Sequence, residues 1–163
     1  MPTTGSPDPS LPTPQPHAAR RRWMSVLARA GADEITALLA GAPALPRHVR
    51  LRGPEAGLVM LRGRSGGGGA AFNLGEMTVT RCTVRIEGSH VGHAYVPGRD
   101  AAQAELAALL DAALQDPARH DRLLAAVIDP LADRQLAARD AIARRAAATR
   151  VDFFTLATMR TTE

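Results

Sequence analysis

The amino-acid sequence predicts an α+β fold, in which N-terminal and C-terminal helices pack on one face of an antiparallel sheet of about four strands. Three observations support this prediction. Apolar residues recur at helical spacing towards both ends of the chain, and the middle of the chain alternates apolar and polar residues as half-buried strands do. Glycine-containing turns separate the alternating runs.

The N-terminal helical region covers residues 22–39, where apolar side chains recur every three or four positions. Gly31 is expected to divide it into two short helices, and Asp33 is placed to cap the second one. Gly41 and Pro43 then end the helical stretch.

Two strands are expected next, at residues 48–52 and 57–62, with residues 53–56 as the turn between them. The clearest hairpin follows, where residues 77–87 and 90–96 flank a short turn. That turn is predicted to have two residues, Gly88 and Ser89, so the register follows directly. It pairs Ile86 with Val91, Val84 with His93, Cys82 with Tyr95, Arg81 with Val96, Thr83 with Ala94 and Arg85 with Gly92.

The C-terminal part predicts three helices. Residues 102–114 carry apolar side chains at spacings of three and four, and this amphipathic helix should end before Pro117. A shorter helix is expected around residues 123–128. The pair Asp129-Pro130 is typical of a cap followed by the first turn of a new helix, which should run to about Thr149.

The chain is expected to form one domain, residues 20–157, because 163 residues suffice for a single core. Residues 1–19 are rich in proline and are predicted to be a disordered tail, and residues 158–163 a flexible C-terminus. Since alanine supplies much of the apolar content and aromatic residues make up 3%, the core should be thin and aliphatic.

All 20 basic residues are arginine, and the formal net charge is +4. The arginines are spread along the chain and no aromatic stacking platform accompanies them, so nucleic-acid binding is not favoured. The single Cys82 excludes an internal disulfide and a cysteine-cluster metal site. No apolar run approaches the ~20 residues that a membrane-spanning helix needs.

Arg81 and Arg85 are predicted to lie on one exposed face of the sheet, where they can hold carboxylates or phosphates of a partner. An ordinary solvated sheet face explains them equally well. Arg99 is expected to be free to reach a partner, because Asp100 is placed to cap the following helix. Two interpretations of Phe153 and Phe154 stay open: one ring is an interface anchor, or both rings seal the last helix onto the sheet.

The remaining motifs predict no phosphate-binding, metal-binding or catalytic site. The run from Ser65 to Gly69 is rich in glycine but lacks the lysine of a phosphate-binding loop, which favours a plain strand connection. His90 and His93 should point to opposite faces of a strand, so they predict no metal site. No Ser/His/Asp or Cys/His catalytic set can be assembled without choosing distant residues arbitrarily. The sequence therefore predicts no catalytic, cofactor-binding or metal-binding residue.

Several motifs, in order, resemble those of the PhnG family of the bacterial carbon-phosphorus lyase system. The resemblance covers roughly residues 20–157, and its most specific part is Arg-Val-Asp-Phe-Phe-Thr at residues 150–155, which adds Asp152 to the candidate interface residues. The other motifs are Trp-Met-Ser-Val-Leu-Ala at residues 23–28, Glu-Ala-Gly-Leu-Val at 55–59, Leu-Gly-Glu-Met-Thr-Val-Thr-Arg at 74–81, Val-Arg at 84–85, Gly-Arg-Asp at 98–100 and Asp-Pro-Leu at 129–131.

The resemblance implies a cytoplasmic subunit of an obligate hetero-oligomer, with PhnI as the direct partner and PhnH, PhnJ and PhnL as further partners. Together with PhnH, PhnI and PhnL, such a subunit is required when an alkylphosphonate displaces adenine from MgATP, giving α-D-ribose 1-alkylphosphonate 5-triphosphate. The resemblance assigns no cofactor to this chain alone, and places an iron-sulfur cluster and S-adenosylmethionine on another subunit. The alternative is a free-standing nucleotide-binding protein or enzyme that uses the glycine run and the arginines.

Overall fold

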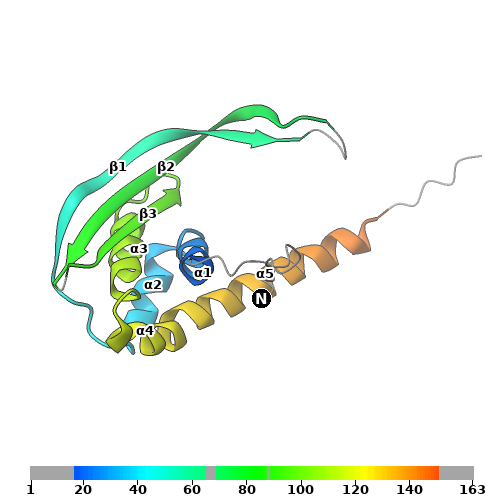
Figure 1. The fold of residues 1–163 in the computed structure, drawn as a ribbon. Helices are drawn as coiled ribbons and strands as arrows, with labels where there is room; N and C mark the ends of the chain where they lie inside the picture. The colour runs from blue at the N-terminus through cyan, green and yellow to red at the C-terminus, as the bar shows by residue number, and fades with distance from the viewer. Residues whose placement is uncertain (1–16, 65–68, 88, 151–163) are drawn as a thin grey trace, which may run out of the picture.

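The computed structural model describes residues 17–64, 69–87 and 89–150. It has the predicted α+β fold, in which helices cover one face of a three-stranded antiparallel sheet of strand order β1-β2-β3 (Figure 1). In chain order the elements are α1 (Ala18–Leu27), α2 (Ala32–Leu39), β1 (His48–Gly63), β2 (Phe72–Ile86), β3 (Val91–Pro97), α3 (Ala101–Ala113), α4 (Pro117–Leu123), the π-helical turn η1 (Leu124–Ile128) and α5 (Asp129–Ala148).

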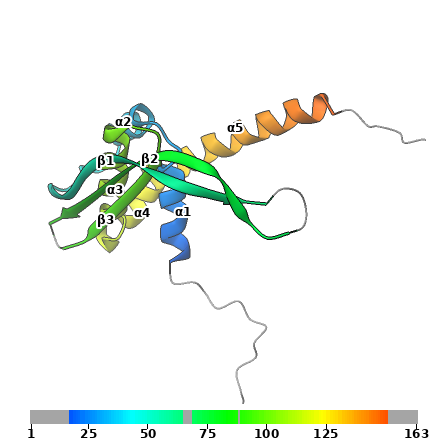
Figure 2. The same cartoon turned by 90° about the horizontal axis from the view of Figure 1, so that it is seen from above.

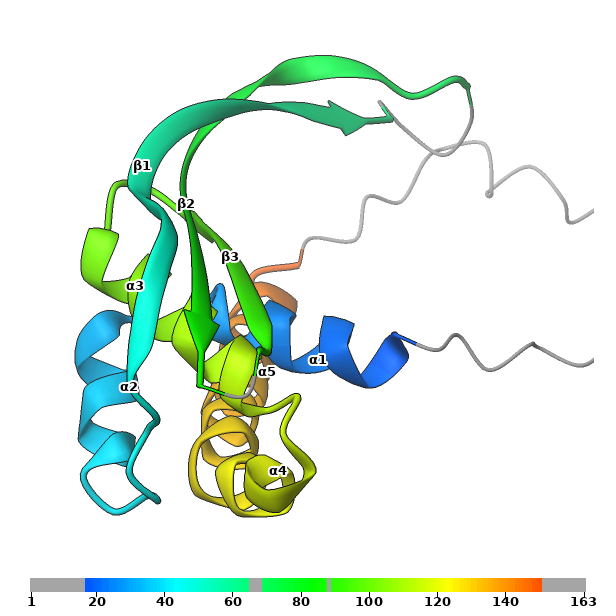
Figure 3. The same ribbon diagram turned by 60° about the vertical axis from the view of Figure 1, so that its left-hand side comes forward.

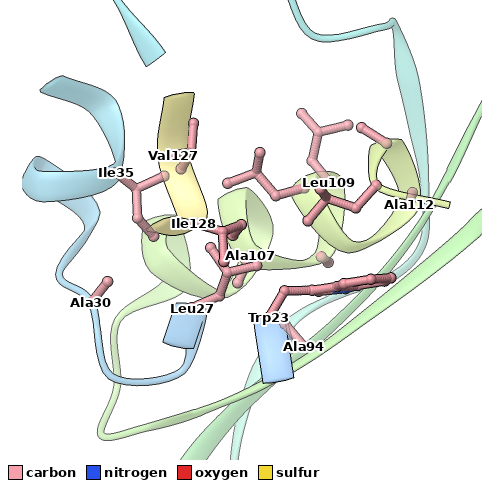
Figure 4. Close-up of a cluster of buried hydrophobic side chains, with 14 of the residues drawn as sticks. Trp23, Leu27, Ala30, Ile35, Ala94, Ala107, Leu109, Ala112, Val127 and Ile128 are labelled. Carbon is pink, nitrogen blue, oxygen red and sulfur yellow. The ribbon is translucent and has the colours of Figure 1, made fainter. Parts of the chain in front are cut away.

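Helix α3 is the centre of the core, because it contacts all three strands as well as α1 and α2. The buried cluster around it consists mainly of alanine, leucine and valine side chains, and Trp23 is its one aromatic member among the described residues (Figure 4). The predicted aliphatic core is confirmed. Its small side chains let α3 approach β3 closely, and the helix backbone leaves no room for a β-carbon at Gly92.

The β2–β3 hairpin forms where it is expected, but the predicted register is wrong by one residue. The N–H of Ile86 donates to the carbonyl of His90 at 3.1 Å, so the loop has three residues instead of two. Ser89 has a φ of 72°, the left-handed conformation that three-residue hairpin loops need at their last position. The observed pairs are Arg85 with Val91, Val84 with Gly92, Thr83 with His93, Cys82 with Ala94 and Arg81 with Tyr95.

This shift changes which side chains are buried, since a one-residue slip moves a strand's side chains to the opposite face. Ala94 and Val96 lie in the core, whereas His93 and Tyr95 are exposed on the other face. His93 therefore lies on the face opposite Val84 and Cys82, and not beside them as the predicted register implied.

The first expected hairpin is a single long strand, which is why the sheet has three strands instead of about four. The predicted turn at residues 53–56 stays within β1, whose register shifts between Arg50 and Arg52 and again between Arg52 and Glu55. Such bulges absorb extra residues without reversing the chain. Pro54 is tolerated because β1 is an edge strand.

Two predicted helix caps are also corrected. At the start of α2 the N–H of Gly31 donates to the carboxylate of Glu34 at 3.2 Å, so Glu34 has the capping role that was expected of Asp33. At the start of α5, η1 joins α4 to α5 without a break, and Asp129 has helical dihedral angles. A π turn before Pro130 accommodates the hydrogen bond that proline cannot make.

Strands β1 and β2 extend beyond the rest of the sheet as a two-stranded β arm, defined here as residues 58–63 of β1 and 72–78 of β2. Strand β3 pairs only with residues 79–85 of β2, so the arm has no third strand. Figures 2 and 3 show the arm projecting past the helices. The C-terminal half of α5 projects on the same side of the molecule (Figure 1).

Candidate interaction surfaces

The outer face of the sheet, opposite α3, carries three rows of side chains that cross all three strands. The rows follow from the pairing of β1 with β2 and of β2 with β3. They are Val49, Arg85 and Val91; Arg52, Thr83 and His93; and Glu55, Arg81 and Tyr95. No helix covers this face among the described residues, so Arg81 and Arg85 share one face as predicted, but opposite Tyr95 and Val91 instead of Val96 and Gly92.

Arg81 is paired within the chain. Its Nε donates to Oε1 of Glu55 at 2.7 Å, and Arg52 donates to the same oxygen. Desolvation opposes ionisation of Glu55, but the hydrogen bonds from the two arginines outweigh it and lower the pKa of Glu55. In return, the hydrogen bond to the Glu55 carboxylate raises the pKa of Arg81, and the side chain of Tyr95 adds a smaller effect in the same direction. The charge of Arg81 is therefore largely compensated by Glu55 within the chain.

The side chain of Arg85, at the other end of the face, makes no hydrogen bond or ion pair with another described residue. It lines a cavity of about 420 Å³ where β1 begins and β2 ends. The lining residues are Arg47, His48, Val49, Arg85, Ile86 and Glu87, which we call the basic pocket. The guanidinium group that is available to a partner thus belongs to Arg85, not to Arg81.

On the inner face, Glu105 of α3 holds the start of β1. Its carboxylate accepts from Arg50 Nε at 2.8 Å and Nη2 at 2.7 Å, and lies 2.9 Å from His48 Nε2. The hydrogen bond from Arg50 is the main reason why the pKa of Glu105 is lowered. Nearby, burial raises the pKa of the Cys82 thiol, so this cysteine is not an activated nucleophile. This cluster fixes the position of the strand that carries the basic pocket.

The other candidates from the sequence have mixed outcomes. Asp100 caps α3 by accepting from the N–H of Gln103 at 2.8 Å, as expected, and Arg99 is exposed without a partner among the described residues. Asp152, Phe153 and Phe154 lie outside the described residues, as do four of the five residues of the glycine run.

The β arm is an apolar surface that the sequence analysis did not identify. It exposes large side chains at positions where its strands have no helix beneath them; Leu58 is 63% exposed and Leu74 is 58% exposed. The full set is Leu58, Met60, Leu61, Phe72 and Leu74. A two-stranded ribbon is marginally stable in water by itself, and contiguous exposed apolar surface is typical of a protein interface.

A buried carboxylate at Asp111 joins α1, α3 and β3, and it was also missed. Its side chain is fully buried and accepts four hydrogen bonds: from Arg20 Nε at 3.0 Å and Nη2 at 2.7 Å, from Trp23 Nε1 at 2.9 Å and from the N–H of His93 at 2.9 Å. Because β3 is an edge strand, the bond from His93 satisfies a backbone N–H that has no strand partner. The available signal was an acidic residue within the apolar run Leu-Leu-Asp-Ala-Ala.

Within residues 17–64, 69–87 and 89–150, no group of three or more acidic, histidine or cysteine side chains is placed to hold a metal ion. Across the same ranges no helix combines the length and the apolar content of a membrane span.

Comparison with known proteins decides the family. The sequence pattern of the family described as phosphonate metabolism protein PhnG matches residues 18–159. The chain belongs to the PhnG family. A curated relative from Rhizobium meliloti (strain 1021), the α-D-ribose 1-methylphosphonate 5-triphosphate synthase subunit PhnG, is 46% identical over 139 residues, which are 85% of this chain and 88% of the relative.

Proposed function

We propose that this chain is the PhnG subunit of a synthase that makes α-D-ribose 1-methylphosphonate 5-triphosphate. The observation that carries this proposal is the 46% identity to the Rhizobium subunit over most of both chains. The structure adds a physical reason to expect a subunit: the β arm leaves five large apolar side chains without cover in the isolated chain.

We further propose the partners and the reaction that the family resemblance implies. The chain assembles in the cytoplasm with PhnI, its direct partner, and with PhnH, PhnJ and PhnL. The complex uses MgATP and an alkylphosphonate, which displaces adenine. The iron-sulfur cluster and S-adenosylmethionine of the later cleavage step belong to another subunit.

The contribution of this chain, in our proposal, is to hold partner subunits and not to supply catalytic groups. The β arm and the outer face of the sheet are its docking surfaces. Arg99, Asp152, Phe153 and Phe154 remain candidate interface residues. Support for this role comes from three carboxylates, Asp111, Glu105 and Glu55, which each accept several hydrogen bonds and hold elements of the fold together.

Co-expression tests the assembly. A tagged copy of this chain, expressed with PhnH, PhnI and PhnJ from the same organism, is expected to co-purify with them in a fixed ratio through size exclusion. Calorimetry with MgATP on the isolated chain is the second arm, and no binding is expected at millimolar nucleotide. Tight, stoichiometric binding of MgATP by a chain that captures no partner would support the alternative, a free-standing nucleotide-binding protein.

The double substitution Leu58→Ser and Leu74→Ser is expected to abolish assembly while the isolated chain stays folded. Both side chains are already mostly in water, so the free energy of unfolding should change by less than about 0.5 kcal/mol per site. Buried in an interface, each contributes about 1.5–3 kcal/mol, so the Kd for the partners should rise by about 100-fold or more. Biolayer interferometry against the purified partners measures this change.

Leu136→Ser with Ile142→Ser is the matched control, because these residues are equally exposed on α5. It should weaken assembly by less than about threefold, an amount that corresponds to less than about 0.7 kcal/mol. Equal loss of affinity for both pairs, or loss for the α5 pair alone, would show that the arm is not the main docking element.

A further inference from the structure

We infer that the basic pocket on the outer face of the sheet binds an acidic segment of a partner subunit, with Arg47 and Arg85 as its anchors. This inference rests on the proposed role of the chain as a subunit, and adds where a partner docks and what chemistry it presents.

The strand geometry places the two arginines on one face. His48 pairs with Ile86 and Val49 pairs with Arg85, so Arg47 lies one residue before the pairing begins and shares the face of Val49. Both Arg47 and Arg85 line the cavity of about 420 Å³, and so does Val49, whose exposed side chain lies across from Arg85. The side of the sheet that α3 covers is the opposite one.

The charges of these arginines are not satisfied within the described residues. The arginines elsewhere on β1 and β2 hold carboxylates: Arg50 binds Glu105, and both Arg52 and Arg81 bind Glu55. Arg47 and Arg85 have no such partner, and Glu87 at the rim of the pocket forms no ion pair with either. Two guanidinium groups with up to ten N–H donors thus face one cavity.

The surroundings favour a protein segment over a free phosphate. Phosphate sites commonly offer backbone N–H groups from a glycine-rich turn or a helix start. Here the wall is paired strand, and an exposed apolar side chain lies beside Arg85: Val49 is 53% exposed. Arginine next to apolar side chains is the composition of a protein–protein interface, and a planar guanidinium matches a carboxylate in bidentate fashion.

Charge reversal tests the inference. In the co-expressed complex, Arg47→Glu with Arg85→Glu is expected to raise the Kd for the partners by about 100-fold or more, because like charges would then face each other. The wild-type affinity should also fall as NaCl rises from 50 to 500 mM, and the milder Arg47→Gln with Arg85→Gln should lose most of that salt dependence. The matched control, Arg122→Glu with Arg139→Glu, makes the same change in net charge at exposed positions of α4 and α5, and should alter the Kd by less than threefold.

The outcomes separate this inference from the proposed function. If wild-type chain captures no partner, the proposed function fails. If wild type assembles and the Arg47/Arg85 double variant assembles equally well, the basic pocket is not a docking site. Inorganic phosphate is the second probe: millimolar or tighter binding to the wild type, lost in a double variant that still assembles, would make the pocket a small-anion site and overturn the inference. Lysine substitutions of partner acidic residues that restore binding to the double variant would support it.

Discussion

Gly92→Ala is expected to prevent stable folding. A β-carbon at this position would lie 1.9 Å from the carbonyl oxygen of Ala108 and 2.5 Å from the backbone nitrogen of Ala112. Both atoms belong to the backbone of α3, so no rotamer change relieves the contact. The strand cannot retreat freely either, because Gly92 is paired with Val84 of the central strand β2. Helix α3 would have to move off the sheet and open the core, at a cost of about 3 kcal/mol or more.

Thermal unfolding followed by circular dichroism measures the effect, and Gly57→Ala is the matched control. Gly57 is also a strand glycine, but no atom lies within 4 Å of a β-carbon built there. Its replacement should be neutral or slightly stabilising, since alanine restricts the unfolded chain. Adding Ala112→Gly to Gly92→Ala should not restore stability, because the nearest contact is with the Ala108 carbonyl. A cooperative transition for Gly92→Ala within 3 °C of the wild type would contradict the close packing of β3 on α3.

Asp111→Ala should destabilise the chain by about 3–5 kcal/mol, the cost of removing one partner from a buried ion pair. The substitution leaves the N–H groups of Trp23 and His93 without an acceptor and the Arg20 guanidinium, whose side chain is 30% exposed, without its counter-charge. In a chain of this size such a loss lowers Tm by roughly 10 °C or more. Differential scanning calorimetry measures it.

Asp111→Asn should have an intermediate effect, because it keeps the volume but presents an amide NH₂ where donors already point. Asp133→Ala is the surface control: Asp133 is exposed on α5, and its loss should change the free energy of unfolding by less than about 0.5 kcal/mol. If Asp111→Ala cost no more than Asp133→Ala, the buried carboxylate would not hold α1 against the sheet.

The sequence pattern predicted the fold class and most of the elements, because helical and strand periodicities are local properties. The sequence pattern failed where the conformation of one or two residues sets the length of a loop or the course of a strand. The β2–β3 register depends on whether the loop has two or three residues, and Ser89 in the left-handed conformation makes it three. Likewise, Gly53-Pro54 is typical of a turn, and only pairing with β2 shows that the chain continues straight through it.

The interaction surfaces were harder to predict than the fold, because they depend on which side chains find partners across the sheet. Arg81 and Arg85 are alike in sequence, yet Glu55 neutralises Arg81 and leaves Arg85 available. The role of Asp111 requires α1 to fold back onto α3, 91 residues from Arg20. The β arm was predicted as strands, but its exposure follows only from the end of β3 at Pro97, which pairs with Val79.

Omitting this chain from a reconstituted synthase tests the central claim most directly. Purified PhnH, PhnI and PhnL are supplied with MgATP and methylphosphonate, with or without this chain, and released adenine is measured by chromatography. The account predicts product only when the chain is present, normal product with the Gly57→Ala chain, and almost none with the Leu58→Ser, Leu74→Ser chain. Full adenine release without the chain would contradict it.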